Sequence, residues 1–346
     1  MSKLFSNIQI KDMELKNRIV MAPMCMDSAE SDGKANEWHY IHYVTRAVGG
    51  VGLILLESTA VESRGRITNK DLGIWSDNHI EGLKRIVKEC KKHGSKIGIQ
   101  LGHAGRKCEV SSEEIIGPSP IAFNEEYMTP REMSKDDIND VISSFVEGAI
   151  RADKAGFDAI ELHGAHGYLI GQFLSPLTNR RDDEYGGSLP NRAKFLKKLI
   201  SEVRKVWPNE KPIFLRISAE EYHEDGNHPE DLAMILNLVK AQGIDVIDVS
   251  SGGVVPAKIE TYPGYQIKMA EIIRETVCLP VIGGGLITNS EMAEEIITSD
   301  RSDLVYLGRE LLRNPYWPLQ ASRKSQSDVK WPIQYERSKV VRKNGF

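Results

Sequence analysis

Short runs of aliphatic and β-branched residues alternate with amphipathic stretches along the whole chain, and this alternation is the feature that most constrains its fold. It is typical of repeated strand-and-helix units on a parallel sheet. The runs are almost continuously apolar, which indicates strands that are covered on both faces. Eight strands are predicted, at residues 18–24, 51–58, 96–101, 158–163, 213–218, 246–250, 280–283 and 303–307.

The stretches between the predicted strands carry the signals of helices. Residues 77–93 place a row of apolar side chains on one helical face, and Gly94 stands where a C-terminal cap belongs. Three other helix starts are indicated by capping boxes of Ser134 with Asp137 and of Thr288 with Glu291, and by Pro190 as a first-turn residue.

Eight such units predict an α/β protein with a closed (β/α)8 barrel, the TIM barrel. An open, doubly wound sheet is the alternative, but neither G-x-G-x-x-G nor a Walker A sequence follows the first strand. Residues 103–131 and 164–189 are too long for simple turns and are candidate substrate lids, because long loops of this fold build the active site. No linker divides the chain, so residues 1–337 are predicted to form one domain, followed by a C-terminal tail, 338–346.

Composition narrows the class of protein. The 346 residues are 40% apolar, and a net charge of -4 with a pI near 6.2 disfavours nucleic-acid binding, which needs a basic surface. No apolar run is long enough to span a membrane, and the first residues lack the apolar core of a secretory signal. We therefore expect a cytoplasmic protein that acts on a small molecule and binds neither membrane nor nucleic acid.

The four cysteines are too few and too scattered to predict a disulfide framework, a zinc site or an iron–sulfur cluster. Cys25 differs from Cys90, Cys108 and Cys278 because it stands where the first predicted strand opens into a loop.

The motif His163-Gly-Ala-His166-Gly-Tyr168 closes the fourth predicted strand. Two imidazoles offer N–H donors that can converge on one oxygen, and a neutral phenol with a pKa of about 10 can protonate a basic carbon. A buried polar pair and a metal site are the alternatives. A metal would need more ligands than these two histidines, and His103 more naturally begins the next loop. We therefore expect a catalytic cluster and no metal.

Glycines follow the last two predicted strands. Gly283, Gly284 and Gly285 come after strand seven, and Gly308 with Arg309 after strand eight. In a barrel of this kind these two loops usually bind phosphate through exposed backbone N–H groups. A tight turn is the alternative, but the position favours a phosphate site.

Gln100 and Arg216 are predicted to face the barrel centre from strands three and five. An amide and a fixed cation suit the edge of a flavin ring, which becomes anionic on reduction. The alternative for Arg216 is a structural ion pair with Glu161 or Glu57. Schiff-base chemistry is disfavoured because the sixth strand, 246–250, carries no lysine.

These residues resemble the old yellow enzyme family, and in particular its short, thermophilic-type bacterial branch of FMN-dependent ene-reductases. The resemblance extends from about residue 5 to residue 337. The matching words are Ala22-Pro-Met-Cys25-Met, Gly65-Arg-Ile-Thr, Asp71-Leu-Gly-Ile-Trp75, Gln100-Leu-Gly-His-Ala-Gly-Arg-Lys107, the motif from His163 to Leu169, Asp183-Glu-Tyr-Gly-Gly187, Leu307-Gly-Arg-Glu-Leu-Leu and Gln334-Tyr-Glu-Arg337.

The resemblance implies an oxidoreductase that binds FMN across the barrel mouth. NADPH or NADH would reduce the flavin and leave before the second substrate, an activated alkene such as an enone or enal, or a nitro compound or quinone, is reduced. His163 and His166 would bind the activating oxygen, flavin N5 would give hydride to the β-carbon, and Tyr168 would protonate the α-carbon. The implied flavin contacts are Pro23, Met24, Cys25, Ser58, Gln100 and Arg216, with Gly284, Gly285, Gly308 and Arg309 at the phosphate.

Three residues are expected to shape substrate binding. Asp27 replaces a tyrosine that the branch carries at this position, and we expect Lys107 or Arg337 to pair with its carboxylate. The segment ending at Arg337 resembles one that reaches into a neighbouring subunit's active site. The resemblance therefore implies a homodimer or homotetramer.

Other departures from the branch pattern are Gly164, Gly171 and Gln172. They stand where the branch usually has Ala, His and Glu. We expect them to widen the pocket or loosen its lid.

Two other functions fit parts of the pattern. A dienoyl-CoA-type reductase would normally add an iron–sulfur segment and a second dinucleotide domain, and neither fits in this length. A catalytically silent flavin-binding sensor or partner protein is disfavoured by the presence of His163, His166 and Tyr168.

Overall fold

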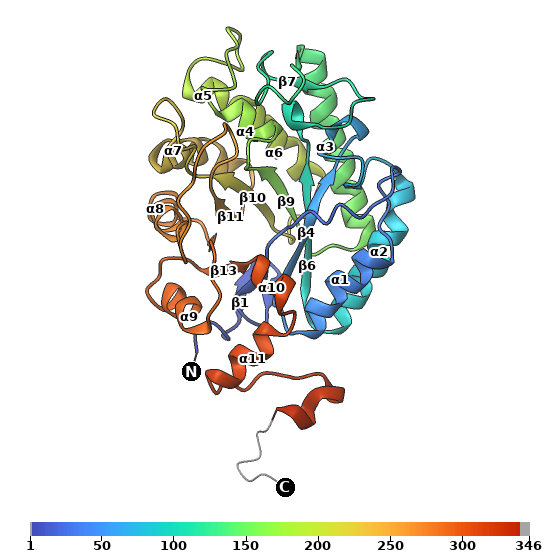
Figure 1. Ribbon diagram of the computed structural model, residues 1–346, viewed down its shortest axis with the longest axis vertical. Coiled ribbons are helices and arrows are strands. Elements are labelled where there is room, and N and C mark those ends of the chain that lie inside the picture. The colour runs from blue at the N-terminus through green and yellow to red at the C-terminus, as the bar shows by residue number, and fades with distance from the viewer. Residues whose placement is uncertain (1, 340–346) are drawn as a thin grey trace.

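The computed structural model describes residues 2–339 and contains eight parallel strands surrounded by helices (Figure 1). In chain order the barrel strands are β3 (Ile19–Met21), β4 (Leu53–Ala60), β6 (Lys96–Gly102), β9 (Ala159–Gly164), β10 (Ile213–Ser218), β11 (Val246–Ser250), β12 (Val281–Gly283) and β13 (Leu304–Leu307). The barrel is closed because β3 pairs in parallel with both β13 and β4. This confirms the predicted (β/α)8 fold.

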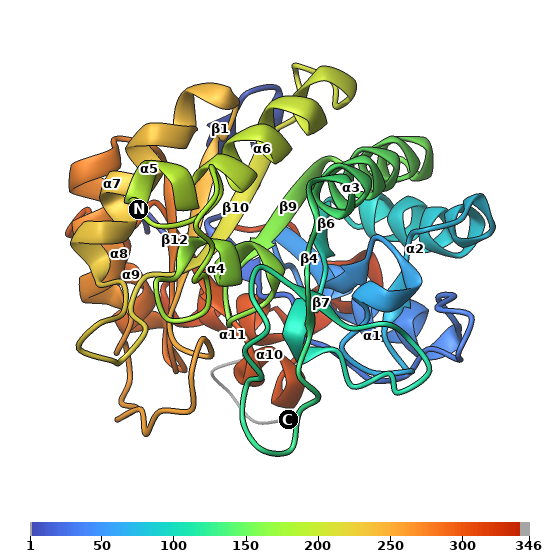
Figure 2. The same cartoon turned by 90° about the horizontal axis from the view of Figure 1, so that it is seen from above.

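Helices form a ring outside the strands when the barrel is seen from above (Figure 2). Each long helix turns an apolar row towards the strands, as the row of Leu83, Ile86 and Val87 shows. The helices are α1 (Glu37–Val48), α2 (Ile80–Lys92), α3 (Lys135–Ala155), α4 (Leu169–Leu174), α5 (Leu189–Arg192), α6 (Lys194–Val206), α7 (Pro229–Val239), α8 (Ile267–Val277), α9 (Ser290–Thr298), α10 (Arg309–Arg313) and α11 (Trp317–Lys324).

One predicted capping box is confirmed and the other is wrong. The Ser134 hydroxyl accepts a hydrogen bond from the Asp137 N–H, and the Asp137 carboxylate accepts one from the Ser134 N–H. At α9 the cap is Asn289 and not Thr288, because the Asn289 side chain accepts the N–H of Met292. An amide one residue later therefore takes the role expected of the hydroxyl.

Two helix starts also differ from the prediction. Residues 77–79 form a 3-10 turn, η2 (Asp77–His79), before α2 begins. Pro190 lies in the first turn of the short helix α5, and the apolar row predicted for the same helix belongs to the separate helix α6.

A hairpin that was not predicted lies at the N-terminal end of the barrel. Its strands, β1 (Ile8–Ile10) and β2 (Met13–Leu15), pair antiparallel. Their apolar side chains share one buried cluster with Leu53, Phe214 and Val246 from the barrel interior. The hairpin therefore fills the base of the barrel, and the site must lie at the other end.

Three long connections lie at the C-terminal ends of the strands. The two predicted lids are present, and the first contains η3 (Gly105–Lys107) and the small pair β7 (Ile116–Gly117) and β8 (Arg131–Glu132). A third, residues 251–266, follows β11 and was not predicted. The remaining short elements are β5 (Leu72–Gly73), η1 (Ser63–Gly65), η4 (Lys240–Gln242) and η5 (Ile333–Ser338).

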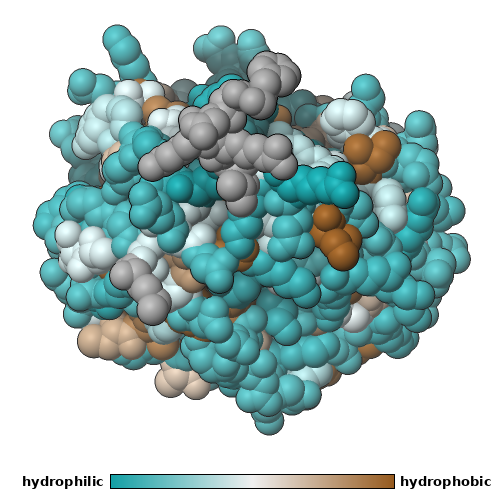
Figure 3. Space-filling view, turned by 90° about the horizontal axis from the view of Figure 1, so that it is seen from below, coloured by the Kyte–Doolittle hydropathy of each residue, from teal (hydrophilic) through white to brown (hydrophobic). Residues whose placement is uncertain are grey.

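Seen from the side on which α11 lies, the surface is mainly hydrophilic, with apolar residues in small separate patches (Figure 3). Among the described residues, no helix has the length and apolarity needed to cross a membrane. The predicted tail, 338–346, lies outside the described residues except for its first two positions.

Candidate active site

The His163, His166 and Tyr168 side chains lie together at the end of β9. The His163 ring centroid is 5.3 Å from that of His166 and 5.0 Å from that of Tyr168, both in edge-to-face geometry. His163 is the last buried polar residue of the strand, and the chain then turns through His166, which has φ 57° in the left-handed region. A non-glycine residue in this conformation is uncommon and often marks a functional site.

Hydrogen bonds fix the orientation of both imidazoles. The Ala165 N–H donates to His163 Nδ1 over 3.4 Å, so the proton of neutral His163 is on Nε2. His166 Nε2 lies 2.8 Å from Ser250 Oγ, and the His166 N–H donates to Ser218 Oγ over 2.8 Å. Strands β10 and β11 therefore hold the turn that carries His166.

The cluster is neutral and protonated at the phenol. Burial lowers the pKa of His163 and His166 well below 6.5, and the positive charges of Arg216 and Lys107 lower both further. Burial raises the pKa of Tyr168 above 10, and the nearby Cys25 and Asp71 add to the shift. At neutral pH the site thus offers two uncharged imidazoles and a phenol that keeps its proton.

Lys107 joins the three long loops. Its ammonium donates to the backbone oxygens of His166 (3.1 Å) and Gly253 (3.3 Å) and lies 5.1 Å from the Tyr168 ring centroid. Burial, followed by the charge of Arg106, lowers the pKa of Lys107 to about 8.

The expected pairing of Lys107 with Asp27 is wrong. Asp27 is exposed, and its carboxylate accepts a hydrogen bond from Thr68 Oγ1 over 3.1 Å. Within residues 2–339 of this single chain, Arg337 is not paired with Asp27 either. Because Asp27 is exposed, water solvates its carboxylate, and the charge needs no buried cation beside it.

Polar side chains line the barrel interior below this cluster. Gln100 Nε2 donates to Glu161 Oε1 over 2.8 Å, and Arg216 Nε lies 3.2 Å from Asp248 Oδ2. The strand register explains the arrangement, because Arg216 is level with His163 on one neighbour and with Asp248 on the other. Gln100 and Arg216 therefore face the barrel centre as predicted, and Arg216 pairs with Asp248 and not with Glu57.

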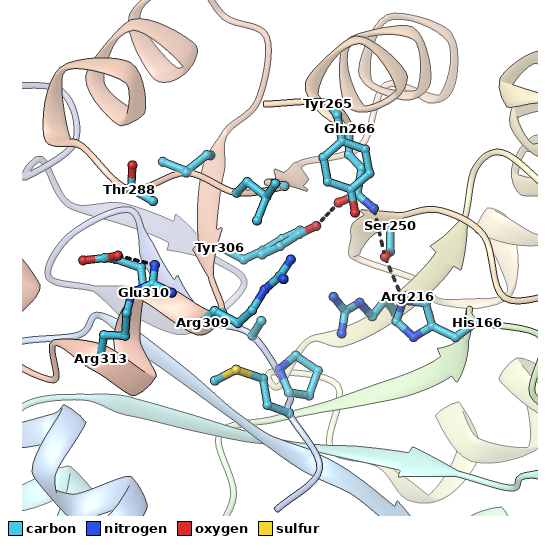
Figure 4. A pocket seen from close by; sticks show the side chains of 17 residues that line it. His166, Arg216, Ser250, Tyr265, Gln266, Thr288, Tyr306, Arg309, Glu310 and Arg313 are labelled. Carbon is cyan, nitrogen blue, oxygen red and sulfur yellow. Dashed lines mark hydrogen bonds and ion pairs between the residues drawn. The ribbon is translucent and has the colours of Figure 1, made fainter. Parts of the chain in front are cut away.

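A cavity of about 240 Å³ opens beside His166 and Arg216 (Figure 4). Arg216 and Arg309 extend into it from strand β10 and from the start of α10. Its predicted lining residues are Pro23, Met24, His166, Arg216, Gly285, Gly308 and Arg309, and its other lining residues are Ala22, Ser250, Tyr265, Gln266, Leu286, Ile287, Thr288, Tyr306, Glu310 and Arg313.

The structure brings some predicted residues to this cavity and leaves others beside it. Gly285 has φ 99°, and a Cβ there would lie 2.9 Å from the Tyr265 ring, so this turn requires glycine. Gly284 instead faces Tyr306, where a Cβ would come within 2.4 Å of the ring. The predicted residues that do not line the cavity are Cys25, Asp27, Ser58, Gln100, Lys107, His163, Tyr168, Gly284 and Arg337.

Cys25 lies in a loop that a buried carboxylate anchors. Glu57 Oε2 accepts the Met26 N–H over 2.9 Å, and Glu57 Oε1 accepts the Tyr43 hydroxyl over 2.8 Å. The register of β4 against β6 shifts between Leu56 and Ser58, so Glu57 is the extra residue of a β-bulge. Desolvation of the sulfur, followed by neighbouring carboxylates, raises the pKa of the Cys25 thiol, which therefore stays protonated.

The expected loosening of the lid is not found at Gln172. Its amide is fully buried, accepts the Arg106 N–H over 3.2 Å, and donates to the oxygens of Ala104 (3.0 Å) and Gly167 (2.8 Å). Gln172 therefore ties the first lid to the second.

Gly164 and Gly171 allow a close approach of backbone segments. A Cβ at Gly164 would lie 2.8 Å from the Arg216 carbonyl oxygen, and one at Gly171 would lie 3.1 Å from the Gly164 oxygen. These glycines bring β9, β10 and α4 close together. The predicted widening of the pocket stays a prediction.

Several site residues were not predicted. Tyr306 is buried, donates to Gln266 Oε1, and lies under the Arg216 guanidinium at 5.4 Å. Asp248 pairs with the same guanidinium. The sequence signal that could have identified Tyr306 and Asp248 is the alternation of side chains along a strand, since every second residue of a barrel strand faces inward. Within residues 2–339, no group of three or more His, Cys, Asp or Glu side chains is arranged to hold a metal.

The fold and the site define a class of flavin-dependent barrel oxidoreductases. The chain matches the NADH:flavin oxidoreductase / NADH oxidase family over residues 3–328, and it belongs to that family, the old yellow enzymes.

Its relatives include several enzymes named NADPH dehydrogenase. That of Clostridium acetobutylicum is 55% identical over 337 residues, which are 97% of this chain and 99% of the relative. That of Bacillus subtilis (strain 168) is 51% identical over 336 residues, 97% of this chain and 98% of the relative. The protein is an NAD(P)H-dependent FMN oxidoreductase.

Solved structures share the fold. Morphinone reductase aligns with a TM-score of 0.81 at 25% identity and covers 96% of this chain and 91% of its own. A 2-naphthoyl-CoA reductase complex aligns with a TM-score of 0.88 at 24% identity over 94% of this chain, which corresponds to 52% of that longer chain.

The residues at the cavity fit FMN. One end combines apolar Pro23 and Met24 with the Arg216 cation, which suits a flavin edge. The other end combines Gly308 with Arg309, which suits a phosphate.

Proposed function

We propose that the enzyme reduces the activated C=C bonds of enones and enals. In this proposal His163 and His166 bind the substrate oxygen, and the phenol of Tyr168 donates a proton. The observation that carries the proposal is the neutral cluster of His163, His166 and Tyr168 beside a cavity that fits FMN. Nitro compounds and quinones are further candidates, because they also present an oxygen to hydrogen-bond donors.

When bound, FMN supplies the redox chemistry: it accepts hydride from NADPH or NADH and gives it to the β-carbon of the alkene. His163 Nε2–H and a ring N–H of His166 donate hydrogen bonds to the substrate oxygen and favour negative charge there. Tyr168 delivers its proton to the α-carbon as general acid.

The chain's contacts with FMN are part of the proposal. Arg216 and Gln100 would hold the polar edge of the ring, where a cation and an amide can meet its oxygen and nitrogen atoms. The backbone of the two glycine loops and the Arg309 guanidinium would hold the phosphate. The ring contacts proposed are Pro23, Met24, Cys25, Ser58, Gln100 and Arg216, and the phosphate contacts are Gly284, Gly285, Gly308 and Arg309.

We also propose that the substrate side of the site is built from Asp27, Lys107 and the Arg337 of a neighbouring copy in a homodimer or homotetramer. Support comes from η5, in which Ile333 is 79% and Tyr335 40% exposed. Apolar and aromatic side chains at this level of exposure are typical of a protein interface.

Replacement of Tyr168 by Phe tests the reaction. We expect reduction of the enzyme by NADPH at the wild-type rate, because the phenol is not needed to accept hydride. Reoxidation by 2-cyclohexenone, followed by anaerobic stopped-flow absorbance, should slow about 10²- to 10⁴-fold, the usual contribution of a general acid.

The control is Tyr127→Phe, which removes a phenol of the first lid that donates to Glu109 and stands outside the cluster. A Tyr168→Phe enzyme that 2-cyclohexenone reoxidises as fast as wild type would contradict the proposal. Wild-type enzyme that NADPH reduces but that no enone or enal reoxidises would favour a silent flavin-binding protein.

A further inference from the structure

Three charged side chains lie together inside the barrel, and one of them, Arg216, lines the cavity. Glu161 and Asp248 are completely buried and Arg216 is 5% exposed. Apolar side chains such as Phe214 and Ile282 fill the interior next to them. Two carboxylates with one guanidinium would leave a net negative charge in this dry space, which is costly unless a proton neutralises it.

Hydrogen bonding identifies where a proton belongs. Glu161 Oε1 is satisfied by Gln100 Nε2 at 2.8 Å, whereas Glu161 Oε2 and both Asp248 oxygens have no aligned donor. Glu161 on β9 and Asp248 on β11 lie on the two strands that flank β10, and each carboxyl group interacts with the other and with Arg216. A buried acceptor without a donor is energetically costly. One proton on Glu161, donated to Asp248, satisfies an oxygen of each residue.

We propose that Glu161 and Asp248 share a single proton, with Glu161 as the donor, and that together they position Arg216 and balance its charge at the flavin. The inference rests on the proposed contact of Arg216 with FMN. Asp248 is the partner that stays ionised, since its Oδ2 lies 3.2 Å from Arg216 Nε. Burial and the Asp248 charge raise the pKa of Glu161 well above 4.5, in agreement with this assignment.

The arrangement has an electrical consequence. With one shared proton, the three side chains carry no net charge. The positive charge of Arg216 beside the flavin ring is then balanced by the negative charge of Asp248. Loss of the proton would add a negative charge beneath FMN and disfavour its reduction. Loss of both carboxyl groups would leave the cation uncompensated and favour the more negatively charged reduced FMN.

Midpoint potentials of the FMN-loaded enzyme test the proposal. Glu161→Gln exchanges one neutral group for another, so we expect a potential within error of wild type. The double variant Glu161→Gln with Asp248→Asn should raise the potential. A rise in Glu161→Gln alone would overturn the proposal, because it would mean that Glu161 is ionised in the wild-type enzyme.

Infrared spectroscopy gives a second readout that does not depend on the position of FMN. The wild-type enzyme should show the C=O stretch of a protonated carboxylic acid, and ¹³C labelling of glutamate should move that band. Glu161→Gln should remove the band, and the matched control Glu57→Gln should retain it. A spectrum in which Glu161→Gln removes no band would overturn the shared proton.

The two measurements separate the inference from the proposed function. If the infrared band behaves as expected and the double variant keeps the wild-type potential, the proton is shared but Arg216 does not contact FMN, which overturns the electrical part. If the double variant does not fold, the infrared spectra of the labelled wild type and of Glu161→Gln still show whether Glu161 carries the proton.

Discussion

The charge state of the active-site imidazoles follows from where the chain places them. His163 and His166 are packed beside Arg216 and Lys107, and burial among cations disfavours a positive charge on either ring. A neutral imidazole donates one hydrogen bond and accepts another, so each ring can be held by the protein through one nitrogen and used through the other. The contacts of His163 with Ala165 and of His166 with Ser250 have this form.

Glu57 makes stability depend on pH. Burial raises its pKa from 4.5 to about 7, so between these values the folded protein binds a proton that the unfolded chain has lost. Stability therefore falls as pH rises through this window, by roughly 3 kcal/mol for this group. Glu57→Gln cannot lose a proton, so its free energy of unfolding in urea should fall less than that of wild type between about pH 5 and about pH 8. Equal losses in the two proteins would contradict this prediction.

Asp27 is expected to influence which alkene is preferred. It is exposed and has φ 47°, a conformation that Asp tolerates better than Tyr. We expect Asp27→Tyr to change the relative kcat/KM values over a panel of enones by about tenfold, the size of an ordinary pocket contact. Asp27→Asn is the matched control, because it removes the charge and keeps the shape. A panel of enones with unchanged preferences in Asp27→Tyr would disprove the role.

Residue types at strand ends could be predicted because a barrel brings all those ends to one rim. Arg216, Gln100 and the histidine pair were recognisable in this way. Tyr306 and Asp248 were not, because each lies within an apolar run, and a sequence does not reveal which inward-facing neighbours share a level of the barrel. That level depends on the stagger of the strands.

Among the elements, α4 and η3 are joined by one amide. Gln172 satisfies three backbone groups, those of Arg106, Ala104 and Gly167. Gln172→Ala leaves them buried without partners, so we expect the free energy of unfolding to fall by about 1–3 kcal/mol. Hydrogen exchange should become faster in residues 103–107.

Gln172→Glu is the informative comparison, because a carboxylate can accept from Arg106 but cannot donate to the two carbonyl oxygens. It should therefore lose stability as well. If residues 103–107 of Gln172→Ala exchange hydrogen at the wild-type rate, the Gln172 amide does not stabilise the first lid.

The barrel strands could be predicted from their length and apolarity, and their ends were less certain. The first strand was expected to reach Met24 and ends at Met21, because the chain leaves the sheet to line the cavity. The β-bulge at Glu57 and the basal hairpin were not predicted. Both depend on contacts between distant segments, which local sequence patterns do not contain.

At the scale of the whole molecule, η5 is the segment proposed to contact a neighbouring copy. Deletion of residues 333–346 removes the exposed Ile333 and Tyr335, and we expect it to lower the mass measured by light scattering to that of a monomer. Arg337→Ala should keep the wild-type assembly and raise KM for the alkene. A truncated protein that keeps both the assembly and KM would contradict the proposed interface.

The hairpin of β1 and β2 has a consequence for turnover. Because it closes the base of the barrel, the proposed reaction leaves the nicotinamide and the alkene the same open end of the barrel. We therefore expect each to leave before the other binds. A large excess of either compound should inhibit the enzyme, because it occupies the site in the oxidation state with which it cannot react. The rate of turnover should therefore be highest at an intermediate ratio of nicotinamide to alkene and fall when either is in excess.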